Sequence, residues 1–282
     1  MTDRPYPSRF LRFLGTAGAR FTIIRQLRAS GGLWLGLGDS SFVIDPGPGS
    51  LVRICEAQPP LDPMALSAIL LTHRHIDHST DLNVLTEAMT GGGFHHQGHV
   101  ILPEDAVASP CCYLLPYLKE KIGALHVWKE GEAVTLPGKV TVRPVRLTHH
   151  RVDCFGFVAE VPEMAPFGLI SDARFEERWL DFYRDCPLLV VNMTLPHRCE
   201  GIDHLCPADV ARIIATLEPR QILLTHLGRG VLMSGAEEVA ASLTTGGTRV
   251  IAARDGMVID LETYETWETQ ARFEPALSPD RV

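Results

Sequence analysis

An apolar run that ends in a cluster of metal-binding residue types is the strongest constraint that this sequence places on its fold. Residues 66–71 are apolar apart from Ser67, as in a strand that is covered on both faces of its sheet. The chain continues directly into His73-Arg74-His75-Ile76-Asp77-His78. Four potential ligands in such a short stretch cannot all face one point on a helix, but in a tight loop two can bind one metal ion and two another. The sequence therefore predicts a buried strand that carries a two-metal site at its end.

Short apolar runs alternate with helical patterns along the rest of the chain, which indicates an α/β fold. We expect a helix after His78, with Asp81 near its start, and further helices over residues 207–217 and 236–243. The expected strands are residues 10–14, 32–37, 41–44, 66–71, 100–102, 140–145, 155–160, 167–170, 188–191, 221–224, 250–253 and 257–260. Together they suggest two β-sheets packed face to face with helices outside.

Length and composition favour a single domain. The chain has 282 residues, of which 45% are hydrophobic, so it can bury a large core without disulfides. We expect one domain over residues 1–282, with a loosely held polar tail from about 269 to 282. The formal net charge of −8 gives no general attraction for nucleic acid or for an anionic membrane surface.

The cysteines and the N-terminus point to a cytoplasmic protein. The cysteine count of seven is odd and no Cys-x-x-Cys pair occurs, so we expect reduced thiols. The N-terminus lacks the pattern of a signal peptide, and no apolar run reaches the ~20 residues that span a bilayer. We therefore expect no membrane association.

More histidines and an aspartate lie at the ends of expected strands. Leu70-Leu71-Thr72-His73 is echoed by Leu223-Leu224-Thr225-His226, which predicts that both histidines point into one crevice. Asp172 follows the apolar run 167–171, and His149 and His150 follow another expected strand. Two clustered metal ions need a bridging carboxylate and ligands from elsewhere in the chain, and Asp172 is the best candidate for the bridge.

With these motifs the chain resembles the metallo-β-lactamase superfamily, most nearly its ribonuclease Z-like branch. The residues 73–78 fit the H-x-H-x-D-H signature, and Asp45-Pro46-Gly47 matches the D-x-G turn ahead of it. Ser171-Asp172 and Leu224-Thr225-His226 are similar to the segments that supply the bridging aspartate and the last histidine. The resemblance extends from Phe13 to about Asp260 and implies a four-layer αββα sandwich.

The resemblance also implies a ligand set. In ribonuclease Z-like proteins a glycine follows one histidine ligand by six positions, and Gly156 then selects His150, with His149 as a neighbour. Asp77 is implied to hold the proton of the attacking water, which two divalent ions, zinc or else manganese or iron, would activate. The implied ligands are His73, His75 and His150 on one metal, Asp77, His78 and His226 on the other, and Asp172 between them.

His204 narrows the expected substrate class. It lies 22 residues before His226, where ribonuclease Z-like phosphodiesterases carry a histidine that stabilises the transition state or protonates the leaving oxygen. The resemblance thus implies a phosphodiesterase for a small phosphodiester or a cyclic nucleotide. Homodimers are common in this branch, so a homodimer is expected by resemblance.

Two departures argue against a tRNA substrate. Only about twenty residues separate His150 from Asp172, so the long basic arm of ribonuclease Z is absent, and Asn192 stands where that family has glutamate. The alternatives are an armless tRNA 3′-processing endonuclease or a lactone, thioester or β-lactam hydrolase. A redox protein or a scaffold fits less well, because no flavodoxin-like extension is present and the ligand set is complete. His95, His96 and His99, after three glycines, are either a surface loop or a lid at the metal cleft.

Overall fold

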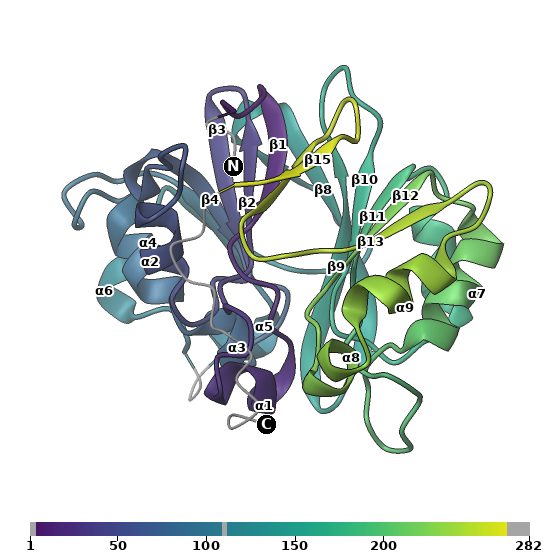
Figure 1. Ribbon diagram of the computed structural model, residues 1–282. Helices are drawn as coiled ribbons and strands as arrows, with labels where there is room; N and C mark the ends of the chain where they lie inside the picture. Colours follow the sequence, from purple (N-terminus) through teal and green to yellow (C-terminus); the bar gives the residue numbers. More distant parts are fainter. Residues whose placement is uncertain (1–3, 109–111, 270–282) are drawn as a thin grey trace.

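Two β-sheets pack face to face in the computed structural model, which describes residues 4–108 and 112–269 (Figure 1). The first sheet has the strand order β15-β14-β1-β2-β3-β4-β5-β6 and the second has the order β13-β12-β11-β10-β9-β8-β7. The strands of the first sheet are β1 (Arg9–Phe13), β2 (Leu33–Leu37), β3 (Ser40–Ile44), β4 (Leu66–Leu70), β5 (His99–Leu102), β6 (Ala124–Val127), β14 (Met257–Asp260) and β15 (Thr266–Glu268). Those of the second are β7 (Val134–Leu136), β8 (Val140–His149), β9 (Val152–Glu160), β10 (Phe167–Ile170), β11 (Leu188–Asn192), β12 (Gln221–Thr225) and β13 (Arg249–Ala252).

Helices cover the outer face of each sheet, which confirms the four-layer αββα sandwich (Figure 1). The α-helices are α1 (Ala19–Ile24), α2 (Ser50–Cys55), α3 (Ile76–Ser79), α4 (Leu82–Met89), α5 (Glu104–Val107), α6 (Pro116–Lys119), α7 (Pro207–Leu217), α8 (Arg229–Met233) and α9 (Ala236–Leu243). Short 3₁₀ segments are η1 (Pro63–Ala65), η2 (Pro137–Lys139) and η3 (Glu177–Tyr183). Helices α2, α4 and α6 lie on the first sheet, and α7 and α9 lie on the second.

The period of two in each strand divides its side chains between two layers of core. In β1, Leu11 and Phe13 point into the core between the sheets, while Phe10 packs under the helices of the first sheet. In β9, Phe157 belongs to the core between the sheets and Val158 to the cluster under α7 and α9. Each sheet is therefore buried on both faces, as the largely apolar run 66–71 predicted.

Strand direction brings the predicted ligands to one edge of the sandwich. Strands β10, β11 and β12 are parallel, and β8 runs in the same direction as β10 because both are antiparallel to the intervening β9. Their C-terminal ends lead into Asp172, Asn192, His226 and His149. Strand β4 of the opposite sheet leads into His73. The ligands follow the C-terminal ends of these strands, the position that open α/β sheets use for ligand binding.

The segment that contains His95, His96 and His99 does not lie over the metal loop. His99 is the first residue of β5, and its register partner on the parallel strand β4 is Ala68, well before the metal loop. The Nδ1 atom of His99 lies 3.2 Å from Nε2 of His126 on β6. The lid interpretation was therefore wrong, since this segment leads into the opposite end of the sheet from the metal loop.

The described residues bear on two expectations, the absence of a membrane-spanning helix and the state of the cysteines. Within residues 4–108 and 112–269, no helix has the length and apolar composition needed to cross a membrane. Each cysteine in those ranges has a free thiol, as the odd count suggested. The tail from residue 270 onward, which the sequence predicts to be loosely held, lies outside the described residues.

Candidate metal centre

Asp45 holds the loop that carries the first four histidine and aspartate side chains. Its carboxylate accepts hydrogen bonds from the backbone N–H of Thr72 (2.7 Å), the hydroxyl of Thr72 (2.8 Å) and Nδ1 of His78 (2.9 Å). Gly47 follows in the same turn, and a Cβ atom added there would lie 2.1 Å from the carbonyl oxygen of Asp77. The Asp45-Pro46-Gly47 turn therefore fixes the metal loop both by hydrogen bonds and by close backbone packing.

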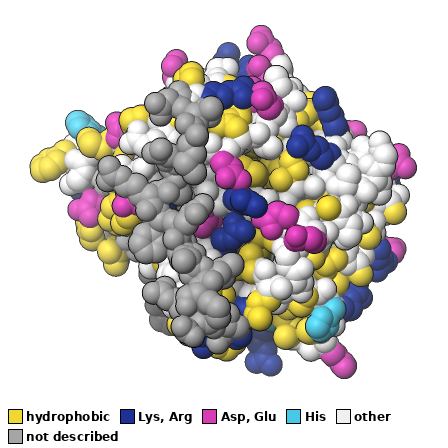
Figure 2. Space-filling model, in the orientation of Figure 1, with side chains coloured by type: hydrophobic (Ala, Val, Ile, Leu, Met, Phe, Trp, Pro, Cys, Tyr) yellow, Lys and Arg dark blue, Asp and Glu magenta, His cyan; other side chains and the backbone are white. Residues whose placement is uncertain are grey.

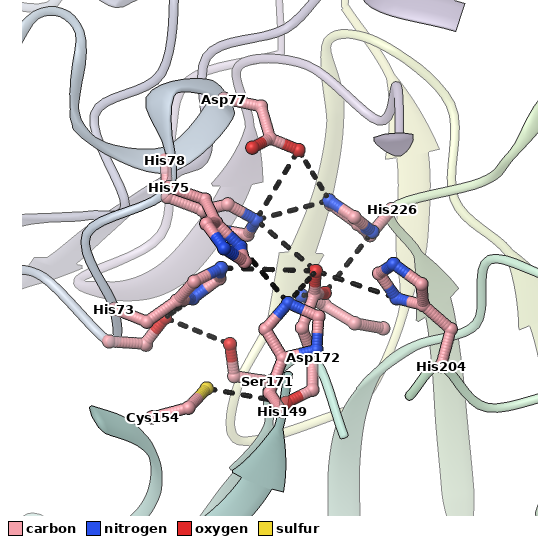
Figure 3. Close-up of polar contacts among 12 residues, drawn as sticks. His73, His75, Asp77, His78, His149, Cys154, Ser171, Asp172, His204 and His226 are labelled. Atoms are coloured by element: carbon pink, nitrogen blue, oxygen red, sulfur yellow. Dashed lines mark hydrogen bonds and ion pairs between the residues drawn. The ribbon is translucent and has the colours of Figure 1, made fainter. Parts of the chain in front are cut away.

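The predicted ligand side chains other than His150, together with His149, converge on Asp172 (Figure 3). Its Oδ2 atom lies 3.6 Å from Nε2 of His78, 3.6 Å from Nε2 of His149 and 4.0 Å from Nε2 of His73. On one side of this carboxylate a group of three can hold an ion, namely His73, His75 and His149. On the other side a second group can do so, namely Asp77, His78 and His226. Asp172 therefore lies between the two groups, within 4.0 Å of a nitrogen in each.

In His78 and His226, a hydrogen bond from the ring nitrogen Nδ1 determines that the other nitrogen, Nε2, faces the metal centre. His78 donates from Nδ1 to the Asp45 carboxylate, which leaves the lone pair on Nε2. At His226 the Thr194 hydroxyl donates to the backbone carbonyl (3.1 Å), so its oxygen accepts from Nδ1 (2.8 Å). Nε2 of His226 then faces the centre with a free lone pair.

Hydrogen bonds from Nδ1 also orient His149 and His73, in the group formed by His73, His75 and His149. Nδ1 of His149 donates to the backbone carbonyl of Asp203 (2.8 Å), and this bond leaves Nε2 as the acceptor. The Thr72 hydroxyl donates to Asp45, so it accepts from Nδ1 of His73 (3.1 Å). Each of these imidazoles is thereby oriented as an Nε2 ligand, while His75 turns its Nδ1 atom inward.

The nitrogen positions are compatible with bound metal ions. Nε2 of His149 lies 3.1 Å from Nδ1 of His75, and Nε2 of His78 lies 3.1 Å from Nε2 of His226. Ligands about 2.0 Å from a tetrahedral zinc ion lie roughly 3.3 Å apart, which is close to both of these separations. Nε2 of His73 is fully buried and has no hydrogen-bond partner among the described residues. The donor set thus fits divalent cations.

Burial and charge keep most of these ligands ready to bind metal at neutral pH. Burial is the main cause that lowers the pKa values of His75 and His149 to about 4, so both imidazoles are neutral. Burial opposes ionisation of Asp172, but the neighbouring His226, His204 and His78 hold its pKa well below the usual range. In the metal-free protein His78 behaves differently, because the carboxylates of Asp77 and Asp45 overcome burial and raise its pKa.

The expectation that His150 is a ligand stays a prediction. The side-chain positions favour His149 beside His73 and His75, although His150 also forms a possible ion-binding group with His149 and His204. His149 is the last residue of β8, its side chain is 1% exposed and its Nε2 atom points to the centre. His150 occupies the β8–β9 turn with φ at +46°, and its side chain is 37% exposed. Its backbone N–H donates to the Asp203 carboxylate (2.7 Å), which holds the turn in this conformation. The structure therefore places His149 with His73 and His75, and His150 at the rim.

His204 also points into the centre, where the resemblance placed it. Its Nδ1 atom lies 3.5 Å from Oδ2 of Asp172 and is buried without a hydrogen-bond partner among the described residues. Its ring lies 4.9 Å from that of His149 and 5.8 Å from that of His226. Burial lowers its pKa to about 4, so His204 is a neutral imidazole in the metal-free protein.

Asn192 and Thr194 have roles that the sequence did not reveal. The amide of Asn192 donates to Oδ1 of Asp172 (2.8 Å), and the same oxygen lies 3.2 Å from Nδ1 of His226, whereas Oδ2 faces His73, His78 and His149. Thr194 fixes the ring of His226, as described above. Both residues come at the end of β11, between β10 and β12, so their strand-end position was the available signal.

Comparison with known proteins agrees with this geometry. The sequence matches the model of the β-lactamase superfamily domain over residues 41–227. An uncharacterized protein of Methanocaldococcus jannaschii is 26% identical over 255 residues, which span 88% of this chain and 94% of that protein.

Solved structures show the same fold. The metallo-β-lactamase fold protein YhfI from Bacillus subtilis superposes with a TM-score of 0.73 at 20% identity, covering 89% of this chain and 98% of that one. The short form of human tRNase Z gives a TM-score of 0.63 at 16% identity, covering 89% and 99%. By its sequence match and its fold, with histidine and aspartate side chains gathered at the strand ends, the chain belongs to the β-lactamase superfamily.

Proposed function

We propose that this protein is a two-metal phosphodiesterase that acts on a small organic phosphodiester. The observation that carries this proposal is the inward orientation of His204, whose unpartnered Nδ1 atom faces the same space as Asp172 and His149. Members of the superfamily are metal-dependent hydrolases, and the cluster can hold metal ions. Beyond this, we propose the number of bound ions, the class of substrate and the roles of individual side chains.

The side chains divide into metal holders and groups that act on the substrate. His73, His75 and His149 would hold one ion, Asp77, His78 and His226 the other, and Asp172 both. When bound, two divalent ions supply Lewis acidity that activates water and polarises a phosphoryl oxygen. Oδ2 of Asp77, 3.2 Å from Nε2 of His226, is placed to accept a hydrogen bond from the attacking water and to orient it.

Charge balance favours an anionic substrate. Two divalent ions would bring four positive charges, and the carboxylates of Asp77 and Asp172 offset two of them. The histidine ligands are neutral when they bind metal. A phosphodiester carries one negative charge and is attracted to the remaining positive charge, whereas a lactone or thioester gains less.

His204 would supply a hydrogen-bond donor, which phosphoryl transfer requires in addition to the metal ions. A buried imidazole next to the reacting phosphorus can donate an N–H to a developing oxyanion or to the leaving oxygen. A lactone or thioester hydrolase does not need a second such donor in the same form. The pKa of about 4 belongs to the empty pocket, and a bound anion would raise it and favour proton donation.

A small substrate fits better than tRNA. The connection between β9 and β10 spans only residues 161–166, so no arm extends from this position. On the face shown in Figure 2, basic side chains lie among acidic ones and form no continuous basic surface. Gripping a nucleic acid backbone requires a row of lysine and arginine side chains along a groove.

The test is an assay of metal-analysed protein with bis-p-nitrophenyl phosphate and cyclic nucleotides. We expect wild-type protein with about two metal ions per chain to release p-nitrophenolate. Asp172→Ala should lose both metal and activity, whereas His204→Ala should keep its metal and lose about 10²–10⁴-fold in kcat. A protein that holds two metal ions but leaves every phosphodiester intact would overturn the proposed substrate class, and lactones and thioesters would be assayed next.

A further inference from the structure

Exposed apolar side chains occur in several of the segments that carry or adjoin the candidate ligands. Ile76 lies between the candidate ligands His75 and Asp77 and is 75% exposed. Ile202 is two residues before His204 and is 43% exposed, and Met233, in the helix that follows His226, is 62% exposed. Large apolar side chains at such positions are unexpected in segments whose neighbours bind metal ions or act on a charged substrate.

Helix α1 adds two more apolar side chains to this border. Phe21 and Ile24 on this short helix are 64% and 74% exposed. The helix begins after Gly18, whose N–H donates to the carbonyl of Leu227 (3.0 Å) and where a Cβ atom would lie 1.9 Å from the carbonyl oxygen of His226. Helix α1 also contacts α3, which carries Asp77 and His78. Figure 1 shows α1, α3 and α8 together at the lower end of the sandwich.

The base of the α1 segment is fixed while its apolar side chains remain exposed. The Asp255 carboxylate accepts hydrogen bonds from the N–H and hydroxyl of Thr16 (2.8 and 2.7 Å) and from the N–H of Ala29 (2.6 Å). Thr22 and Leu27 are buried within the segment. The segment is thus anchored beside His226, and the exposure of Phe21 and Ile24 does not come from a detached loop. We call Phe21, Ile24, Ile76, Ile202 and Met233 the apolar rim.

Two arginines lie in the same segments. Arg20 is exposed in α1, and Arg151 is exposed at the tip of the β8–β9 turn, next to His150. Neither forms an ion pair with any of the described residues. This turn lies near the metal centre, because the ring of His150 is 6.0 Å from that of His75. Exposed apolar side chains, and arginines without an ion-pair partner among the described residues, therefore occur together in α1 and in the segments next to the candidate ligands.

We infer that the apolar rim binds an apolar organic group of the substrate, next to the phosphoryl group at the metal centre. The inference rests on the proposed phosphodiesterase function and deepens it: the substrate class is an amphiphilic phosphodiester, with an aryl or alkyl group of several carbons. Exposed apolar surface can mark an interaction site, and here α1, which carries Phe21 and Ile24, contacts α3, which carries Ile76 and the candidate ligands Asp77 and His78. The cationic side chains complement a phosphate, and the apolar side chains complement the group attached to it.

The test compares p-nitrophenyl alkyl phosphates that share one leaving group. Changing the other ester group from methyl to hexyl leaves the chemistry unchanged and adds only apolar length. We expect kcat/KM of the wild type to rise roughly tenfold or more along this series, because each methylene that leaves water on an open rim contributes about twofold. In the double variant Phe21→Ala/Ile24→Ala, the hexyl-to-methyl ratio of kcat/KM should fall towards one, with metal content unchanged.

Phe182→Ala is the matched control. Phe182 is 47% exposed in η3, on the outer face of the second sheet, so the same truncation there should leave the hexyl-to-methyl ratio as in the wild type. A wild-type ratio near one, or a ratio that Phe21→Ala/Ile24→Ala does not change, would overturn the inference.

A binding measurement separates this inference from the proposed function. Methylphosphonate and hexylphosphonate are titrated into the metal-loaded protein by calorimetry, which requires no turnover. If no phosphodiester is cleaved but hexylphosphonate binds about tenfold more tightly, and the double variant loses that preference, the rim inference stands and the phosphodiesterase proposal fails. If chain length has no effect on binding and the double variant alters only sedimentation or vesicle binding, the rim is a self-association or membrane surface and the inference is wrong.

Discussion

The hydrogen bond behind each imidazole decides which nitrogen faces the metal centre, and Thr194 offers the cleanest test of this at the scale of one residue. Its hydroxyl accepts from Nδ1 of His226 and donates to the backbone carbonyl of the same residue. Thr194→Val keeps the shape of the side chain but removes the acceptor, so the tautomer of His226 is no longer fixed. We expect zinc affinity to fall about 10–100-fold in competition with a chelator. Thr194→Ser keeps the hydroxyl and should retain most of the affinity, and equal affinities for the valine variant and the wild type would contradict this role.

We predict opposite effects on metal content for alanine variants of the neighbouring residues His149 and His150. His149 is buried against His75 and Asp172, so His149→Ala should reduce the metal content measured by mass spectrometry from about two ions per chain towards one. His150→Ala removes a half-exposed ring and should leave the metal content unchanged. Loss of metal from the His150 variant alone would restore the spacing-based assignment.

The difference between the spacing-based assignment and the side-chain geometry has a physical reason. Spacing from Gly156 counts residues along the chain, but the side that a histidine faces depends on where β8 ends and its turn begins. Strand β8 extends to His149, four residues beyond the expected strand, and the turn reverses at His150 with a positive φ. By contrast, His73, Asp172 and His226 could be predicted because each follows a short apolar run that ends unambiguously.

At the scale of elements, the α1 segment depends on a single carboxylate. Asp255→Ala would leave the N–H groups of Thr16 and Ala29 without their acceptor and should cost about 1–3 kcal/mol of unfolding free energy. Hydrogen exchange should rise most in residues 16–29, beside His226. Asp39→Ala, which truncates an exposed aspartate at the β2–β3 turn, is the control and should change neither quantity. Uniform exchange across the chain in the Asp255 variant would show that the carboxylate does not anchor this segment.

Elements with a strong local pattern were predictable and short ones were not. Helices α7 and α9 and strand β14 have the expected bounds, and α7 has a proline in its first turn and a capping box between Cys206 and Asp209. Helix α1 was missed because its exposed Phe21 and Ile24 blur the amphipathic pattern. Strands β6, β7 and β15 have three or four residues each and no fully buried alternation, so only their pairing partners define them.

At the scale of the whole molecule, the centre joins the two sheets. The first sheet supplies the metal loop after β4, and the second supplies His149, Asp172 and His226 from β8, β10 and β12. Bound metal would therefore add a crosslink between two layers that also meet at this edge through hydrogen bonds, such as that from the Gly18 N–H to the Leu227 carbonyl (3.0 Å). Ligands that bind only the folded state raise its stability by mass action, so chelation should lower the melting temperature of the intact chain.

The metal-free protein should also become less stable as the pH falls. Burial lowers the folded-state pKa values of His75, His149 and His204 to about 4, against about 6.5 for an unfolded chain. Between these values the unfolded state binds protons that the folded state does not, so stability is lost as the pH drops from about 6.5 towards 4. His78 opposes this trend, because nearby carboxylates raise its pKa above the ordinary value in spite of burial. Burial also lowers the pKa of His73 well below its ordinary value, so four histidines with lowered pKa values outweigh one with a raised value. We therefore expect urea unfolding in a chelator to show a loss on the order of 1–3 kcal/mol between pH 7 and pH 5. An unchanged urea midpoint would mean that these imidazoles are not buried together in the folded chain.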